Sequence, residues 1–511
     1  MKQQAVVNVD LADVWGERGR ENLLHTLAWG DEITILNSSA TEVEIEVTRF
    51  EEQPDGSILP VTSTGFISPT KSSRIKTSDI FVARDENQVL KVNFVDVQQG
   101  DGAVIESPDG KVMLVDGGDN QLFSRYLAGR FRGTSLEKPK EIDCILVTHG
   151  DADHFQGLPE IFESETHKER RKRLFIQPLR YFHNGIVKRP SKIDGESVPD
   201  EKLLGATQKV GKDVILTGLE DDLLAVPDKE MNAPFKKWKK ALTAYHQRHA
   251  IAFRRLEFGD NEAFDFFNDA AKNLRIEVLG PLMWEKDGVR GLKFLGEPPK
   301  GPRAGHESLS LEEKDFTGLS ASHTINGHSI VFRLVYGGFS YLFCGDLNDE
   351  ASRFLTREHN AGNLNLMAEV FKVPHHGSAD FSGAFMQAVS PVVSVVSSGD
   401  ESARKEYIHP RATLMGALGR YSRVAEPLIF VTELVAFFQM EGWSRRQTKK
   451  NEPTGSSYFG FSRAAYGIVK TRTDGKRLLV YTDSGNIKMK EAYAYQLDES
   501  GVPQPSPVRR A

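Results

Sequence analysis

The chain has 511 residues, of which 39% are hydrophobic and 27% are charged, a composition typical of folded proteins rather than disordered ones. Its 65 basic and 71 acidic side chains give a net charge of −6. The molecule as a whole therefore lacks the excess of positive charge that is typical of nucleic-acid-binding proteins. There is no apolar run of about 18 residues and no signal peptide at the beginning, so we expect a cytoplasmic protein with no membrane contact.

At roughly 150 residues per domain, the length predicts two or three units. Residues 1–85 are predicted to form a small β-rich N-terminal domain, because residues 32–36 and 42–47 alternate between polar and apolar side chains. This domain is expected to bind a protein partner, a cell-wall component or a second copy of the chain, and the sequence leaves these three alternatives open. A second domain is predicted over residues 88–490, and it begins with short apolar strands typical of a β-meander.

A long polar segment, at about residues 160–270, is predicted to be a helical insertion in the second domain. Trp238, Leu242, Tyr245, His249 and Phe253 recur every three or four residues, as on one face of an amphipathic helix. Residues 491–511 are predicted to be a disordered tail, since the last ten residues include three prolines.

Four potential metal ligands directly follow the apolar residues 145–147, and they are His149, Asp151, Asp153 and His154. A tight turn at the end of a strand lets such side chains converge, so this loop predicts a site for one or two divalent cations. The simpler interpretation is a loop in which Asp151 or Asp153 caps a helix and the histidines face solvent. That interpretation explains one aspartate and leaves three ligands unexplained.

Further polar residues follow other predicted strands, so one edge of the sheets should carry all of them. Asp116 follows residues 112–115, Asp346 follows residues 339–344, and His375, His376 and Ser378 follow residues 370–373. Hydrolytic metal pairs about 3.5–4 Å apart, bridged by a carboxylate and a hydroxide, provide a nucleophile at neutral pH. Asp346, on a tight Gly-Asp turn, is the candidate for the bridging carboxylate.

Five motifs resemble, in order and spacing, the metallo-β-lactamase fold, and they occupy residues 95–102, 115–118, 148–154, 345–347 and 373–378. The subgroup that the chain most resembles is the hydrolase domain of ComEC-type DNA-uptake competence proteins. The resemblance covers about residues 90–410. It implies an α/β fold in which two mixed sheets form an αββα sandwich, with a binuclear site at one edge.

The resemblance also implies a role for each residue of the site. His149 and Asp151 would bind the first metal, Asp153 and His154 the second, while Asp346 would bridge and His375 would complete the second site. Asp153, His376 and Ser378 are the catalytic candidates, the last two as donors to the phosphate or the leaving group. Asp116 resembles the family's supporting acid, which orients the ligand loop.

Two departures from the family's usual pattern bear on the metal. Asp151 stands where most relatives have a histidine, and Asn326 with Ser329 stands near the family's middle histidine; the competence subgroup shares both features. Fewer nitrogen and more oxygen ligands favour hard ions, so manganese competes with zinc for the two metal positions. His323 and His328 are uncertain additional candidates, and His409 either reaches the site or lies on the surface.

We expect the protein to be a metal-dependent phosphodiesterase that attacks with a metal-bound hydroxide, and a nuclease is the favoured type. A basic run, with Arg170, Arg171, Lys172 and Arg173 as substrate-binding candidates, could hold a nucleic-acid backbone, although such runs are more often solvated helix faces. The alternative substrate is a small phosphodiester of the cyclic nucleotide or phosphorylcholine type. The alternative of another class is a regulatory or binding module with a structural metal site.

Overall fold

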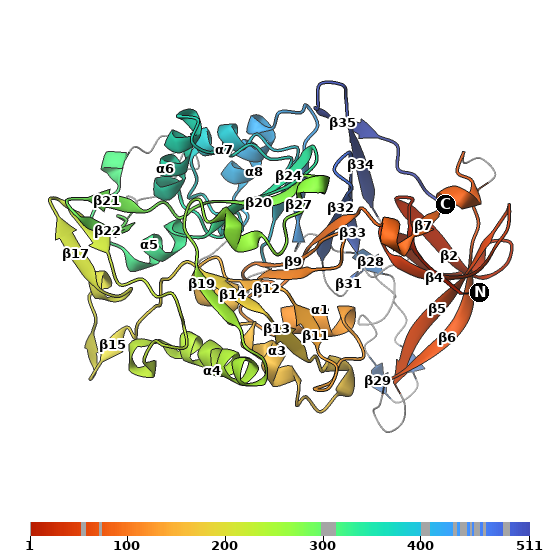
Figure 1. Ribbon diagram of the computed structural model, residues 1–511, viewed down its shortest axis with the longest axis horizontal. Helices are drawn as coiled ribbons and strands as arrows, with labels where there is room; N and C mark the ends of the chain where they lie inside the picture. The colour runs from red at the N-terminus through yellow and green to blue at the C-terminus, as the bar shows by residue number, and fades with distance from the viewer. Residues whose placement is uncertain are drawn as a thin grey trace.

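The computed structural model describes residues 2–52, 58–70, 74–297, 313–399, 409–432, 437–439, 447–449, 452–453, 460–462, 467–483 and 491–511. Two β-sheets pack face to face in the centre of the molecule, and helices cover both outer sides (Figure 1). This arrangement confirms the αββα sandwich predicted from the sequence.

The first sheet of the sandwich begins as an antiparallel meander and continues with parallel strands toward one edge. In its strand order it comprises β19 (Ala252–Arg255), β14 (Arg180–His183), β12 (Cys144–Leu146), β10 (Val112–Asp116), β9 (Gly102–Glu106), β8 (Leu90–Phe94), β32 (Ile468–Thr473), β33 (Arg477–Asp483), β34 (Ala492–Leu497) and β35 (Pro503–Ser506). Residues of β8 alternate, so that Val92 and Phe94 enter the core between the sheets while Lys91 and Asn93 lie on the outer face.

The second sheet has an antiparallel half and a parallel half. Its strands are β20 (Leu274–Gly280), β23 (Val331–Tyr336), β24 (Phe339–Phe343), β25 (Val370–Lys372), β26 (Val393–Val396) and β27 (Leu428–Val431). The two sheets meet through stacked aromatic rings, with Phe343 packed 4.6 Å from Phe332 and 5.7 Å from Phe94 between ring centroids. Because β24 and β25 are parallel, the loops after them emerge at the same edge.

Each outer face of the sandwich has its own helical layer. The first sheet is covered by α1 (Leu122–Arg130), α3 (Pro159–Ser164) and α4 (Ala233–Arg248), and the second by α6 (Asp349–Asn360), α7 (Gly383–Val389) and α8 (Ala412–Tyr421). Trp238 and Leu242 of α4 are fully buried, as their helical spacing predicts. Two short helices, α2 (Ala152–Phe155) and α5 (Ala321–Gly327), lie in loops at the edge of the sandwich.

The segment expected to be a helical insertion is only partly helical. Besides α3 and α4 it contains β13 (Ile176–Pro178), β14, β15 (Lys192–Ile193), β16 (Glu196–Ser197), β17 (Thr207–Val210), β18 (Asp213–Leu216) and β19. The predicted helix stops at Arg248, because His249 is extended and Phe253 belongs to β19. Pairing of β19 with β14 satisfies backbone groups that a longer helix would have bonded internally.

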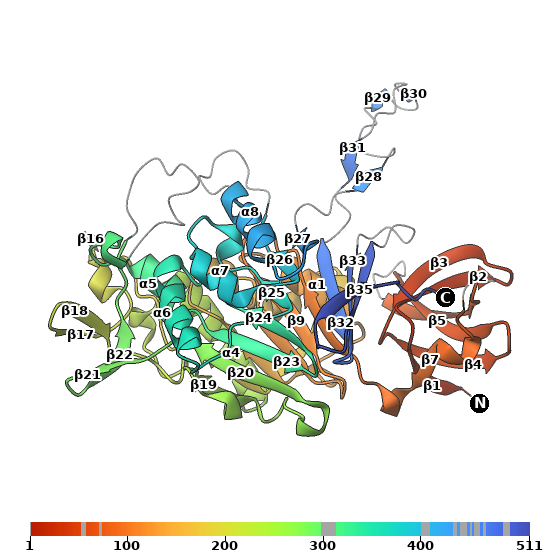
Figure 2. The ribbon, with the colours of Figure 1, turned by 90° about the horizontal axis from the view of Figure 1, so that it is seen from above.

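Seven strands from the first 83 residues form a separate antiparallel sheet, here called the N-terminal sheet. Its strand order is β3 (Glu21–Ala28), β2 (Leu11–Glu17), β6 (Ile58–Ile67), β5 (Val43–Glu52), β4 (Glu32–Ser38), β1 (Gln3–Val7) and β7 (Phe81–Ala83). It has its own apolar core around Val7 and Ile33. Trp29 packs with Leu479 and Tyr481 of β33, and Figures 1 and 2 show the sheet at one end of the molecule.

The C-terminal segment differs from the prediction of a disordered tail. Residues 492–497 and 503–506 form the last two strands of the first sheet, β34 and β35, and Ala511 is buried in the core of the N-terminal sheet. Arg510 pairs with Asp13 at 2.9 Å. The prolines fit because β35 lies at the edge of its sheet, where a residue without an N–H group is tolerated.

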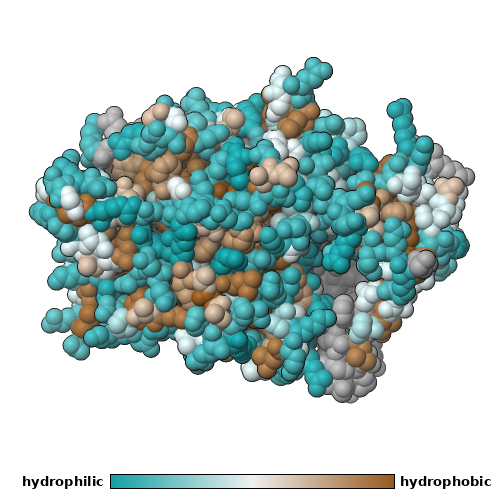
Figure 3. All heavy atoms as spheres, viewed as in Figure 1, coloured by the Kyte–Doolittle hydropathy of each residue, from teal (hydrophilic) through white to brown (hydrophobic). Residues whose placement is uncertain are grey.

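No helix in the described part of the chain has the length and apolar character needed to cross a membrane. The face of the molecule in Figure 3 is mainly hydrophilic, with hydrophobic side chains gathered in small groups.

Candidate metal centre

The loop after β12 carries the predicted ligands, and Asp116 holds it in place. Oδ1 of Asp116 accepts a hydrogen bond from Thr148 N, and its Oδ2 accepts one from Thr148 Oγ1, both at 2.8 Å. The same Oδ2 lies 2.9 Å from Nδ1 of His154. This contact engages one ring nitrogen of His154, so the other, Nε2, is directed at Oδ1 of Asp346 at 3.0 Å.

Asp346 lies at the centre of a ring of histidines. It follows β24 on a turn where Gly345 has a φ of +51°, and a Cβ there would lie 2.7 Å from Thr148 Oγ1 and 2.8 Å from Ser329 Oγ. Only glycine fits such a conformation at such close range. The Asp346 carboxylate lies 3.0 Å from His154, 3.3 Å from His376, 3.9 Å from His375 and 4.0 Å from His149, each distance taken to Nε2.

His376, in the turn after β25, is positioned by a second buried carboxylate. Its Nδ1 lies 3.2 Å from the carbonyl oxygen of Ser397, which can accept a hydrogen bond from it, and 3.3 Å from Oδ1 of Asp101. Lys372 Nζ lies 2.7 Å from that same carboxylate oxygen. Nε2 of His376 therefore faces Oδ2 of Asp153 and Oδ2 of Asp346, both at 3.3 Å. Sequence reasoning did not assign a role to Asp101, although it lies in the motif at residues 95–102.

Asp153, His154, Asp346 and His376 each offer a ligand atom, and these four atoms lie within 4.8 Å of one another. Within the described part of the chain, Nε2 of His149, His154 and His376 and Oδ1 of Asp346 are buried and meet the geometry of no hydrogen bond. Buried polar atoms almost always have a partner. The set therefore fits a divalent cation, which would satisfy several of these atoms at once.

Burial and neighbouring charges set the protonation of these groups. Burial, followed by the neighbouring His154, lowers the pKa of His149 to about 4, so its imidazole is neutral. Burial opposes ionisation of Asp346, but His376 and His154 hold the pKa of its carboxyl well below the usual range. His149 and Asp346 are therefore in the forms that bind metals. Against the effect of burial, the Asp346 carboxylate raises the pKa of both His154 and His376 well above the usual range, so a cation bound there would displace ring protons.

Residues 95–226 match the family described as the metallo-beta-lactamase superfamily. Over these residues the chain resembles a metallo-beta-lactamase domain. It is 41% identical over 86 residues to competence protein ComA of Neisseria gonorrhoeae, and 33% identical over 100 residues to ComE operon protein 3 of Bacillus subtilis. These matches cover 17% and 19% of this chain and 12% of each relative, and they confirm the predicted resemblance over that part. A solved diphosphatase of the PhnP family matches with a TM-score of 0.26 and 11% identity, over 67% of this chain and 95% of that one.

In the metallo-beta-lactamase domain, Asp151 lies beside the group of four rather than within it. Its Oδ1 accepts a hydrogen bond from Lys188 Nζ at 2.7 Å. With its amide nitrogen turned toward the aspartate, Asn326 donates to Oδ2 of Asp151 at 2.9 Å. The assignment of Asp151 and His149 to a first metal stays a prediction, and Lys188 adds a cation at the rim of the centre.

The two neighbouring histidines of the turn after β25 lie differently around Asp346. His376 lies in the group of four, whereas the side chain of His375 is 24% exposed and its Nε2 lies 3.9 Å from Asp346. The roles of His375 as ligand and His376 as donor stay predictions. Both histidines have a φ near +50°, so the turn directs the two side chains differently, and Asp101 holds His376 inward. The ring of His409 lies 6.1 Å from that of His375.

Three other predicted residues are engaged in local structure. Ser378 Oγ accepts a hydrogen bond from Asp380 N at 3.1 Å. His328 is buried with Nε2 2.7 Å from the carbonyl oxygen of Lys293, and burial lowers its pKa to about 4. His323 stacks on Phe316, and its Nδ1 lies 3.6 Å from the Asp380 carboxylate. The structure places none of the three in the group of four.

The basic run of Arg170, Arg171, Lys172 and Arg173 does not lie at the ligand loop. It leads into β13, whose neighbour Phe175 accepts a hydrogen bond from Lys140 N at the start of β11 (Lys140–Ile142). The ligand loop instead follows the far end of β12. Arg171 and Lys172 pair with Glu169 at 2.9 Å and 2.6 Å, as expected for a solvated face.

Proposed function

We propose that the metallo-beta-lactamase domain is a metal-dependent phosphodiesterase. The observation that carries the proposal is the convergence of four ligand atoms, from Asp153, His154, Asp346 and His376, of which three are buried without a hydrogen bond in the described chain. Two of the four side chains are carboxylates, and oxygen-rich sites suit metals that act on phosphoryl groups.

The cation bound there would supply Lewis acidity and neutralise charge that develops on a phosphoryl group. The chain's own residues would orient the metal ligands and bind the substrate. Asp116 and Asp101 each hold one ring nitrogen of a ligand histidine, so the other nitrogen keeps its direction. Lys188, beside Asp151, places an ammonium group where it can attract a phosphate oxygen.

Nucleic acid is the first substrate class to test, and a small phosphodiester is the second. The Neisseria relative is named a competence protein, which favours nucleic acid, although the match spans only 12% of that relative. Two observations favour the small substrate: the basic run at residues 170–173 lies away from the ligand loop, and the net charge is −6. The proposed reaction is the same for both.

Hydrolysis of a substrate panel tests the proposal. The purified chain is assayed with Mn²⁺ or Zn²⁺ on bis-p-nitrophenyl phosphate, single-stranded DNA, duplex DNA and RNA. We expect turnover by the wild type and by the control Asp228→Ala, which changes an exposed carboxylate paired with Lys239, and none by Asp346→Ala. Equal turnover by Asp346→Ala, or no turnover of any phosphodiester by the wild type, would contradict the proposal and favour a binding module.

A further inference from the structure

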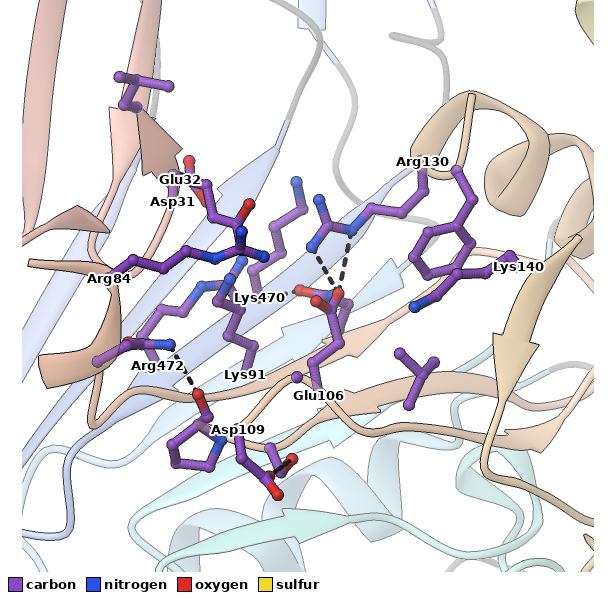
Figure 4. Close-up of a pocket in the computed structure, with 18 of the residues that line it drawn as sticks. Asp31, Glu32, Arg84, Lys91, Glu106, Asp109, Arg130, Lys140, Lys470 and Arg472 are labelled. Atoms are coloured by element: carbon purple, nitrogen blue, oxygen red, sulfur yellow. Dashed lines mark hydrogen bonds and ion pairs between the residues drawn. The ribbon is translucent and has the colours of Figure 1, made fainter. Parts of the chain in front are cut away.

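A cavity of about 1170 Å³ lies between the N-terminal sheet and the outer face of the first sandwich sheet (Figure 4). Its walls come from β8, β9, β32 and the end of α1, and the N-terminal sheet side contributes Asp31, Glu32 and Arg84. The cavity includes Val112 at the start of β10, whereas Asp116 at the end of β10 belongs to the metal centre. The two sites therefore lie at opposite edges of the sheet.

Two buried cations lie directly opposite each other on the floor of this cavity. Lys91 on β8 and Arg472 on β32 are register partners in antiparallel strands, and they are 6% and 2% exposed. Like charges that face each other across a strand pair destabilise a sheet. The fold retains this pair in the place where the cavity opens, so other charges must balance it.

The protein balances these two cations incompletely. Burial lowers the pKa of Lys91, even though the carboxylates of Glu106 and Asp31 attract its ammonium group. Arg472 donates through Nη1 to Asn93 Oδ1 at 3.0 Å, but within the described chain its Nε has no partner. Buried charges without hydrogen bonds are costly, so an anion in the cavity would stabilise both.

Three of the carboxylates that line the cavity, Glu32, Glu106 and Asp109, are paired with other cations. Glu106 accepts two hydrogen bonds from Arg130, at 3.0 Å and 2.5 Å. Glu32 pairs with Arg84 at 3.1 Å, and Asp109 pairs with Lys111 at 3.3 Å. Figure 4 shows Arg84, Lys91 and Lys470 on one side of the space and Arg130 and Lys140 on the other.

We propose that this cavity binds a small ligand that carries phosphate groups, a nucleotide or an inorganic polyphosphate, through Lys91 and Arg472. Small-molecule sites usually occupy about 300–1000 Å³, so the cavity has room for a ligand with more than one phosphate. An arginine fork and a lysine ammonium are the groups that bind phosphate oxygens. The ligand would touch both the N-terminal sheet and the metallo-beta-lactamase domain, and the site does not depend on the metal centre.

Titration calorimetry on the full chain, in buffer with EDTA, tests the proposal. Inorganic phosphate, pyrophosphate and ATP are the probes, and adenosine is the uncharged comparison. We expect pyrophosphate or ATP to bind and adenosine not to bind; pyrophosphate binding alone identifies a polyphosphate site, and ATP binding alone a nucleotide site. Lys91→Met and Lys470→Glu should each weaken binding about tenfold, or about 1.4 kcal/mol. Asp346→Ala and the control Lys209→Met, an exposed lysine of β17 outside the cavity, should bind like the wild type.

Absence of binding heat with both pyrophosphate and ATP would overturn the proposal. Binding by Lys91→Met and Lys470→Glu with the same affinity as the wild type would also overturn it. Hydrogen exchange on the wild type gives a second measurement that requires no variant. We expect added ligand to slow amide exchange in β8 and β32, which carry Lys91 and Arg472. Unchanged exchange in both strands at saturating ligand would place the binding elsewhere and contradict the assignment.

Discussion

Oδ1 of Asp101 lies 3.3 Å from Nδ1 of His376, a contact that matches the 2.9 Å contact between Asp116 and His154. Asp116 hydrogen-bonds to Nδ1 of His154, whereas Nδ1 of His376 lies between the Asp101 carboxylate and the carbonyl oxygen of Ser397. In both histidines Nε2 faces Asp346. The two carboxylates therefore fix two histidines around one central acid. Such supporting carboxylates keep ligand rings in the orientation that a metal requires.

Replacement of Asp101 should weaken metal binding. Asp101→Asn removes the charge that holds both His376 and Lys372, so we expect the affinity for metal, and with it hydrolysis, to fall about 10- to 100-fold. Titration of activity with Mn²⁺ measures the shift, and Asp228→Asn serves as the surface control. The double variant Asp101→Asn with Lys372→Met removes the buried unpaired lysine and should regain stability without regaining metal affinity. Full metal affinity in Asp101→Asn would refute the role given to this residue.

The two adjacent histidines should differ in their effect on metal content. His376→Ala removes a member of the group of four, so we expect the purified protein to lose bound metal. His375→Ala removes a more exposed ring outside that group and should retain more metal than His376→Ala. The metal content of the two variants, measured by mass spectrometry, shows which of the two histidines binds the metal. The reverse order would restore His375 as the ligand and His376 as the donor.

Two glycines with positive φ provide a matched pair for the loop that supports the ligands. A Cβ at Gly100 would lie 1.7 Å from the carbonyl oxygen of Asp153, whereas a Cβ at Gly110 meets nothing within 4 Å. Gly110→Ala should cost only the conformational strain, about 1–3 kcal/mol. Gly100→Ala should cost more and should also displace Asp153. Urea unfolding and metal content measure the two effects; equal losses of stability with metal content intact would contradict the close approach.

Charge reversal in the basic run should leave catalysis unchanged. Arg171 and Lys172 pair with Glu169 on an exposed face, so Arg171→Glu with Lys172→Glu should lower stability by less than about 1 kcal/mol. Rates on bis-p-nitrophenyl phosphate and on single-stranded DNA should match the wild type. The comparison variant is Lys188→Met, which removes the ammonium group paired with Asp151 at the metal centre. It should lower the rates on both substrates. If the reversal abolished DNA cleavage but not hydrolysis of the small substrate, the basic run would bind the nucleic acid after all.

The ligand loop and Asp346 could be located from the sequence because metal ligands directly after apolar strands form a local pattern. The directions of the His375 and His376 side chains could not, since they depend on two consecutive residues with positive φ. The tail was misjudged because prolines suit an edge strand as well as a disordered segment.

Lys91 and Arg472 meet only because β8 pairs with β32, whose residues lie near the other end of the chain. No local periodicity predicts such a pairing, so the cavity between the N-terminal sheet and the sandwich was outside the reach of sequence reasoning. Asp101 was missed for a related reason, because its partners His376 and Lys372 come from the second sheet.

The most direct test of the metal centre is the position of a bound metal in crystals grown with Zn²⁺. An anomalous difference peak is expected about 2.0–2.2 Å from Nε2 of His154 and Nε2 of His376, and from a carboxylate oxygen of Asp153 and of Asp346. A second, weaker peak near His149 and Asp151 would place the other predicted metal. Zinc bound only elsewhere on the chain, with these four side chains free of metal, would contradict the metal centre and the hydrolysis that depends on it.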